Sequence, residues 1–281
     1  MKKGWVCFIF FFLIIKFGHS QDTIWIYYNK DWKEISNKKD AVFYRKAFLD
    51  SNEVWVVNDY YMNNNIQMTG AYKSKKMQEK HGYFVYYHEN GKRKSEGNYL
   101  NNKNNGIWKE YHENGNLKSE GMILNNKSEG EWNYWYENGQ KSAKGNCIAN
   151  KAEGIWEYWH EGGEKKSVGK YLNDSKSGLW QYWFPDGPLQ CEETYKKGLI
   201  SSIAFYFENG TKKYTGSFDN EKMHGEWVYW NIDGRITLKG NYNNGLRHGE
   251  WVRYFPNGNM KINYISNIIQ GKQFGGIVRN E

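Results

Sequence analysis

Large aromatic residues alternate with polar residues along most of the chain, in a pattern that repeats every 24 residues. In one period, the aromatic segment Trp108–Glu113 and the polar segment Asn116–Gly121 flank the pair Asn114-Gly115. Alternation with a period of two is typical of a β-strand with two unlike faces. An Asn-Gly pair between two such segments favours a two-residue type I′ turn, in which both residues take a positive φ. Each period therefore predicts one β-hairpin.

Three series of glycines keep the same phase along the chain. The turn glycines lie 24 residues apart, with one spacing of 23: Gly91, Gly115, Gly139, Gly163, Gly187, Gly210, Gly234 and Gly258. A second series follows each turn glycine by six residues and lapses at Glu193 and Tyr264, and a third series opens the units. Such phased repetition indicates a tandem array of about eight hairpins rather than a globular domain.

The two faces of the predicted sheet differ in composition. Counting outward from the turn places Trp108 opposite Gly121 and Trp156 opposite Gly169. We expect each ring to cover its opposing glycine, because a large ring fills the space that the missing side chain leaves. This face is aromatic throughout, so we assign it the structural role.

The other face is polar except for one aromatic row, the aromatic stripe. The stripe consists of Tyr87, Tyr111, Trp135, Trp159, Trp183, Tyr206, Trp230 and Tyr254. We predict that its four tryptophans, Trp135, Trp159, Trp183 and Trp230, bind a partner, because aromatic anchors tend to dominate binding energy. The alternative is a purely structural stripe, in which the rings pack against lysine stems.

The first twenty residues have the pattern of an export signal. Lys2 and Lys3 precede the apolar run Val6–Ile15, and small residues at Gly18 and Ser20 favour cleavage before Gln21. A retained membrane anchor is the alternative, but the run is about half of the ~20 residues that span a bilayer. The sequence therefore predicts an exported protein of the periplasm, the cell envelope or the extracellular space.

The remaining chain divides around the repeats. Residues 21–57 are predicted as an N-terminal β cap, 58–81 as a degenerate repeat, 82–264 as the tandem repeats, and 265–281 as a C-terminal cap or tail. Atypical ends are expected because an open sheet edge invites other strands to add. The predicted fold is thus all-β: an elongated single-layer antiparallel sheet of two-stranded repeats.

Composition and charge narrow the function. Phe, Trp and Tyr make up 18% of the chain, which suits a thin aromatic sheet better than a thick aliphatic core. Loss of residues 1–20 removes three lysines and no acidic residue, which lowers the formal net charge from +8 to +5. The remaining lysines alternate with Glu, Asn and Gly, which is typical of a solvated surface and does not favour nucleic acid.

The same spacing argues against catalysis and metal binding. Equivalent residues of adjacent units lie two strand spacings apart, about 10 Å. His88 and His112 therefore cannot share a zinc ion, whose nitrogen ligands lie about 2.0–2.1 Å from the metal. Cys147 and Cys191 are two units apart, about 20 Å, so we predict free thiols rather than a disulfide. We expect no catalytic residue, no metal site and no cofactor.

The repeated motif G-x-W-x-x-[YW]-x-x-N-G-x-x-x-x-x-G-x-Y, over about residues 58–264, resembles the bacterial MORN-repeat-variant family. The resemblance implies a long, twisted single-layer sheet that holds partners rather than performing catalysis. Several such bacterial proteins are labelled antitoxins of toxin–antitoxin pairs, and protein scaffolding and membrane-lipid binding are associated with the broader repeat class. An export signal does not suit the antitoxin of a cytoplasmic toxin.

These observations predict a non-enzymatic, exported scaffold that binds a protein partner. Glycan binding is an alternative, because a row of Trp and Tyr can stack on sugar rings. Binding to anionic membrane lipid, helped by the positive charge, is another, and antitoxin-like neutralisation of a partner protein is a third.

Overall fold

The computed structural model describes residues 23–255, 260–269 and 272–278 of the chain. The described residues form one antiparallel sheet of 22 strands, and their one helix is the short 3₁₀ helix η1 (Lys38–Asp40). The predicted signal peptide, residues 1–20, lies outside the described residues, as does part of the predicted tail.

The strands fall into three groups along the chain. The first five are β1 (Ile24–Tyr28), β2 (Glu34–Ile35), β3 (Phe43–Leu49), β4 (Trp55–Tyr61) and β5 (Ile66–Tyr72). The repeat strands are β6 (Lys80–Tyr87), β7 (Arg93–Leu100), β8 (Lys103–Tyr111), β9 (Leu117–Leu124), β10 (Lys127–Trp135), β11 (Lys141–Ile148), β12 (Lys151–Trp159), β13 (Lys165–Leu172), β14 (Ser175–Trp183), β15 (Leu189–Lys196), β16 (Leu199–Tyr206), β17 (Lys212–Asp219), β18 (Lys222–Trp230), β19 (Ile236–Asn243) and β20 (Leu246–Tyr254). The last two are β21 (Met260–Ile269) and β22 (Lys272–Val278).

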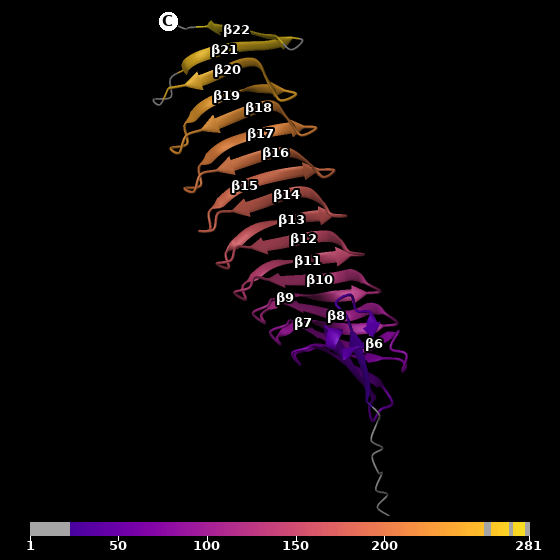
Figure 1. Ribbon diagram of the computed structural model, residues 1–281. Helices are drawn as coiled ribbons and strands as arrows, with labels where there is room; N and C mark the ends of the chain where they lie inside the picture. The colour runs from indigo at the N-terminus through magenta and orange to yellow at the C-terminus, as the bar shows by residue number, and fades with distance from the viewer. Residues whose placement is uncertain (1–22, 256–259, 270–271, 279–281) are drawn as a thin grey trace, which may run out of the picture.

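From β3 onward each strand pairs with the next one along the chain, and β1 pairs with both β2 and β3. Among the described residues no pairing joins the first strands to the last, so the sheet is open. Figure 1 shows the result, a long twisted ribbon whose strands run across its length. The predicted all-β, single-layer array of hairpin repeats is confirmed.

The Asn-Gly turns differ from the prediction. Gly115 has a φ of 89°, whereas Asn114 is not in the positive-φ region. The Gly115 N–H donates to the His112 carbonyl and the His112 N–H donates to the Asn116 carbonyl, both over 2.9 Å. These bonds close a three-residue loop, a type I turn followed by one left-handed residue, where glycine is favoured. The prediction of a two-residue type I′ turn at Asn-Gly was therefore wrong.

The predicted register nevertheless holds away from the turn. A β-bulge between Glu110 and Tyr111 compensates for the longer loop, so Trp108 pairs with Gly121 as counted from the sequence. The same shift recurs beside the turn in each repeat from β6–β7 to β20–β21. The extra turn residue thus leaves the assignment of side chains to faces unchanged.

Two-residue type I′ turns do occur, at the opposite edge of the sheet, where they join each hairpin to the next. Asn125 and Asn126 have φ values of 52° and 67° between the paired residues Leu124 and Lys127. The equivalent pairs are Asn101-Asn102, Ala149-Asn150, Asn173-Asp174, Lys197-Gly198, Asn220-Glu221 and Asn244-Gly245. The two edges of the ribbon therefore carry different turns, and the sequence pattern had suggested only a polar connection at this one.

Several of these type I′ turns are also bonded to the start of the strand that follows the preceding type I′ turn. The Asn126 N–H donates to the Asn104 carbonyl over 3.1 Å, and the Asn104 N–H donates to the Asn126 side-chain oxygen over 2.6 Å. Asn150 and Ser128 repeat this pair of bonds in the next unit. Asparagine at the second turn position therefore serves both the left-handed conformation and the link between units.

We call the side that carries Trp156 and its equivalents the buried face, and the opposite side the stripe face. On the buried face each ring lies over the second-series glycine of the preceding unit. Trp156 pairs with Gly169 by backbone register, but a Cβ atom at Gly145 would overlap its indole ring. Gly169 is covered by Trp180 instead, so the predicted cover of Gly169 by Trp156 was wrong. The same contact joins Gly70 to Phe84, Gly97 to Trp108, Gly121 to Trp132, Gly216 to Trp227 and Gly240 to Trp251.

This contact accounts for the lapse in the glycine series at Glu193. Glu193 pairs with Ile203, the residue that stands in the next unit where the other units have tryptophan or phenylalanine. Isoleucine leaves space for a side chain at position 193, whereas an indole ring does not. The glycine at position 193 and the ring at position 203 are therefore absent for the same steric reason.

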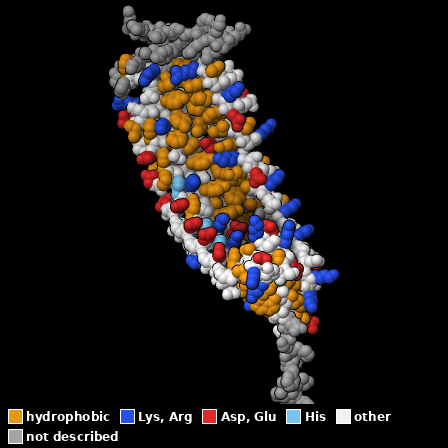
Figure 2. All heavy atoms as spheres, viewed as in Figure 1, with side chains coloured by type: hydrophobic (Ala, Val, Ile, Leu, Met, Phe, Trp, Pro, Cys, Tyr) orange, Lys and Arg blue, Asp and Glu red, His pale blue; other side chains and the backbone are white. Residues whose placement is uncertain are grey.

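The rings of the buried face shield each other along the ribbon, which explains how one layer buries large side chains. Trp180 is 1% exposed, and Tyr171 contacts it edge-on at a centroid distance of 4.9 Å. Figure 2 shows a hydrophobic band along much of the visible face, with charged side chains on both margins. Cys147 and Cys191 are buried and unpaired, as predicted.

The N-terminal strands close the end of this band. Ala47 and Val57 are fully buried against Met68 and Phe84. The sheet edge is held further by Arg45, whose Nε and Nη2 donate to the two carboxylate oxygens of Asp59 over 2.7 and 2.8 Å. Within the described part of the chain, no helix has the length and apolar character needed to cross a membrane.

Candidate partner-binding surface

The four tryptophans of the predicted site occupy one position in their strands. Trp135, Trp159, Trp183 and Trp230 are the last residues of β10, β12, β14 and β18, each beside the turn that joins the two strands of its hairpin, and all four are half-buried. We call each aromatic residue of the stripe a rung. The first three tryptophans are consecutive rungs, whereas Tyr206 separates the fourth from them. The structure therefore places the predicted residues in one row but not in one contiguous cluster.

Lysine side chains lie between the rungs. Lys165 pairs with Trp159 across the hairpin, and its Nζ lies 5.9 Å from the ring centroid of Trp183 in the next unit. Lys141 pairs with Trp135 and lies 5.7 Å from Trp159 in the same way. Cation–π attraction at this distance is worth roughly 0.5–1 kcal/mol at an exposed site. The stripe is thus a row of rings separated by lysines.

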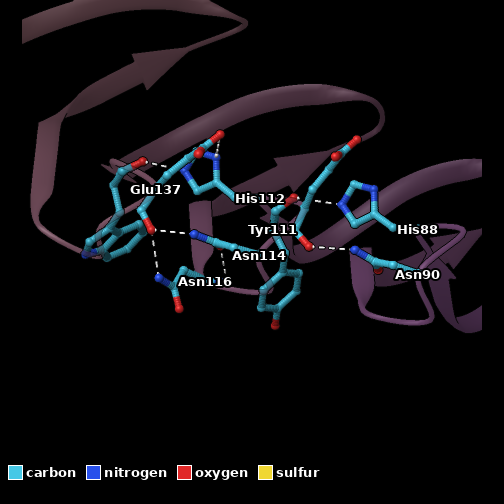
Figure 3. A network of polar contacts seen from close by, with 9 residues as sticks. His88, Asn90, Tyr111, His112, Asn114, Asn116 and Glu137 are labelled. Carbon is cyan, nitrogen blue, oxygen red and sulfur yellow. Dashed lines mark hydrogen bonds and ion pairs between the residues drawn. The ribbon is translucent and has the colours of Figure 1, made fainter.

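The backbones of Tyr111, Trp135, Trp159 and Trp183 are each bonded to a side chain of the preceding unit, and Figure 3 shows the bonds at the first two. His112 Nε2 lies 2.9 Å from the Trp135 carbonyl oxygen, and His88 Nε2 lies 3.2 Å from that of Tyr111. A carbonyl oxygen only accepts, so the histidine nitrogen is the donor in each contact. Each of these histidines therefore links its own unit to the next one by a single hydrogen bond.

The turn asparagines add a second row of bonds at the same edge. Asn114 and Asn116 both donate to the Glu137 carbonyl over 2.7 Å, and Asn90 donates to the Glu113 carbonyl over 2.9 Å (Figure 3). Each described asparagine of an Asn-Gly turn thus has a role beyond the turn itself. These bonds hold consecutive rungs at a constant spacing.

Two of the tyrosines in the stripe, Tyr111 and Tyr206, use their hydroxyl groups in hydrogen bonds within the sheet. The Tyr111 hydroxyl donates to Oε1 of Glu96 over 2.6 Å, and Tyr206 donates to Glu192 over 2.8 Å. Burial, followed by the carboxylate of Glu96, raises the pKa of Tyr111 to about 12. By contrast, the indole N–H groups of the four tryptophan rungs donate no hydrogen bond to any described residue.

The carboxylates, histidines and thiols of the described residues are spread along the array. The glutamates beside the Asn-Gly turns, such as Glu113 and Glu137, are exposed and one per unit. No three His, Cys, Asp or Glu side chains of residues 23–255 come together in a way that would hold a metal ion. Burial, followed by Glu193 and Glu192, raises the pKa of Cys191 to about 12, which disfavours the thiolate.

This geometry defines the class of protein: an open array of β-hairpin repeats with one buried aromatic face and one solvated face. The model of the MORN repeat variant family matches residues 80–101, 104–125, 128–146, 176–197 and 247–264. These five segments of the chain therefore match MORN-variant repeats, and the hairpin array is that of a repeat scaffold. No curated protein matches it significantly.

Proposed function

We propose that this protein is a non-enzymatic, exported scaffold that binds a protein partner along the tryptophan rungs of its stripe. The observation that carries the proposal is that the indole N–H groups of the stripe have no hydrogen-bond partner among the described residues, whereas most of those on the buried face do. On the buried face, Trp156 donates to the Asn146 carbonyl over 3.1 Å, and Trp180, Trp227 and Trp251 make the equivalent bond, whereas the buried indole nitrogen of Trp132 has no partner. The four stripe indoles keep their donors for an outside acceptor.

The surroundings of the stripe favour a protein as the partner. A half-buried tryptophan offers a large apolar area and one directional donor, the combination that is enriched at binding hot spots. The bonds of His112 and His160 to the rung carbonyls hold the rings in place, which lowers the entropic cost of binding. The proposal that the protein is exported is supported by the signal-peptide pattern of residues 1–20.

A capture experiment with a matched control tests the proposal. The exported chain, residues 21–281, is used to capture partners from envelope extract, alongside the double variant Trp159→Ser/Trp183→Ser. The control is Ile155→Ser/Leu179→Ser, which removes exposed apolar side chains from the same strands and the same face, 59% and 51% exposed. We expect the tryptophan variant to lose capture and the control to keep it, with unchanged circular dichroism for both.

Two outcomes would contradict the proposal. Equal capture by wild type and the tryptophan variant would place the binding surface elsewhere. Binding of the wild-type chain to a glycan array, lost in the same variant, would assign the stripe to sugar rings instead of protein.

A further inference from the structure

The buried face carries another arrangement that recurs between units. In it, three aromatic rings surround the side chain of one residue near the start of a strand. In the unit of β14 and β15 the rings are Trp180, Tyr182 and Tyr195. The ammonium group of Lys176 lies 4.7, 5.1 and 5.0 Å from their centroids. It also bonds to the hydroxyl oxygens of Tyr182 and Tyr195 over 2.6 and 3.3 Å. The three rings form a cage around one cation.

The unit of β6 and β7 repeats this cage. Lys80 lies 5.3 Å from Phe84, 5.3 Å from Tyr86 and 4.8 Å from Tyr99, and its ammonium group donates to the Tyr86 hydroxyl over 2.7 Å. The faces of aromatic rings attract cations through their quadrupole, and hydroxyl oxygens accept from an ammonium group. Two distant units therefore build the same site for a lysine side chain.

The unit of β12 and β13 has the rings without the lysine. Trp156 and Tyr158 are 6.0 Å apart with planes at 26°, against 6.3 Å and 24° for Phe84 and Tyr86. The hydroxyls of Tyr158 and Tyr171 are 3.4 Å apart, against 3.3 Å in the Lys80 unit. The position of the lysine is taken by Ala152, whose side chain ends at Cβ.

The other units do not offer this combination. The unit of β18 and β19 has three such rings but places Met223 at the lysine position, and the units of β8 and β10 lack the second or third ring. Among the described residues, no lysine or arginine lies over Trp156, Tyr158 or Tyr171. Both tyrosines are half-buried.

The electrostatic surroundings of this cage favour a cation. The carboxylate of Asp174 accepts from the Ala152 N–H, at a turn position where three preceding units have the neutral Asn102, Asn126 and Asn150. Cys147 pairs with Ala152, and after burial the charges of Asp174 and Glu129 raise the pKa of its thiol. The negative potential of these carboxylates therefore reaches the wall of the cage. Lys176 pairs with Tyr171 on the neighbouring strand, but its ammonium group is held by the rings of Trp180, Tyr182 and Tyr195 and not by those of this cage.

We propose that Trp156, Tyr158 and Tyr171 bind the ammonium group of a lysine side chain supplied by the partner. This inference rests on the proposed function, because the lysine belongs to a protein partner. It adds a second contact surface, on the buried face, to the one on the stripe face. A lysine suits this cage because its ammonium donates to the tyrosine hydroxyls, as Lys176 does. A quaternary ammonium, as in a choline headgroup, has no N–H to donate.

A titration followed by NMR tests this assignment. Nα-acetyl-lysine methylamide is added to the exported chain while the indole N–H resonance of Trp156 is observed, and the norleucine analogue serves as the neutral control. We expect the lysine probe alone to shift Trp156. Ala152→Lys places an ammonium in the cage as in the Lys176 unit, so binding of the probe should weaken about tenfold or more.

The reverse variant provides a second and independent readout. Lys176→Ala should open the neighbouring cage, so that the probe also shifts the indole resonance of Trp180. This variant keeps the test valid even if Ala152→Lys does not fold.

Three results would overturn the assignment. Equal shifts with the norleucine analogue would show apolar contact only, and stronger binding of choline chloride would point to a lipid headgroup. Unchanged binding in Ala152→Lys would place the probe elsewhere. The probes test the cage without any captured protein, so loss of the stripe proposal alone would leave this result standing.

Discussion

Trp156 and Trp159 lie three residues apart on β12, yet they have opposite environments. Trp156 is 7% exposed, lies over Gly145 and donates its indole N–H to the Asn146 carbonyl. Trp159 is half-buried beside Lys141, and its indole donor has no partner among the described residues. Strand parity and the presence of a neighbouring glycine therefore determine what each tryptophan does, whereas residue type alone does not.

The largest expected effect is on stability. Trp156→Ala should lower the free energy of unfolding by about 3–5 kcal/mol, the usual range for a buried large aromatic residue. Trp159→Ala, on the same strand, should cost about 1 kcal/mol, because only part of its ring is buried. Chemical denaturation followed by circular dichroism measures both. If the order were reversed, the two faces would be wrongly assigned and the proposed binding site should be discarded.

A smaller effect tests the contact between ring and glycine. Gly169→Ala places a Cβ against the indole of Trp180 and should cost about 1–3 kcal/mol. Glu193→Ala, one unit later, faces Ile203 and should cost less than about 1 kcal/mol. The double variant Gly169→Ala/Trp180→Ile copies the natural pair at Glu193 and Ile203. Its cost should be well below the sum of the two single costs, and simple additivity would argue against the steric explanation.

The smallest effect leaves stability unchanged and concerns reactivity. Burial raises the pKa values of Cys147 and Cys191, the latter to about 12, so both remain protonated at pH 8. Ellman's reagent should therefore react slowly with the native chain and fully with the denatured one, because only the thiolate attacks. An exposed cysteine introduced on the stripe face, Lys165→Cys, should react at once in the native state. Fast native reaction of the two natural thiols would contradict their placement on the buried face.

The sequence was a good guide to properties that depend on spacing. A 24-residue period with phased glycines predicted the hairpin array, the pairing of Trp108 with Gly121 and the separation of the two cysteines, all of which the structure confirms. It was a poor guide to the turns. Asn-Gly supplies a left-handed glycine to two-residue and three-residue loops alike, so the pair alone cannot select the loop length. The type I′ turns at pairs such as Ala149-Asn150 lack the glycine that would have marked them.

The sequence by itself determined which residues share a face, because side chains alternate with a period of two along every strand. Only the tertiary structure decided which glycine each ring covers, since Trp156 has glycines on both neighbouring strands and its ring leans over Gly145 alone. The cage of Trp156, Tyr158 and Tyr171 likewise depends on how two strands bring three rings together in space. Periodicity specifies the direction of a side chain from its own strand, whereas its contacts depend on rotamers and on the strands beside it.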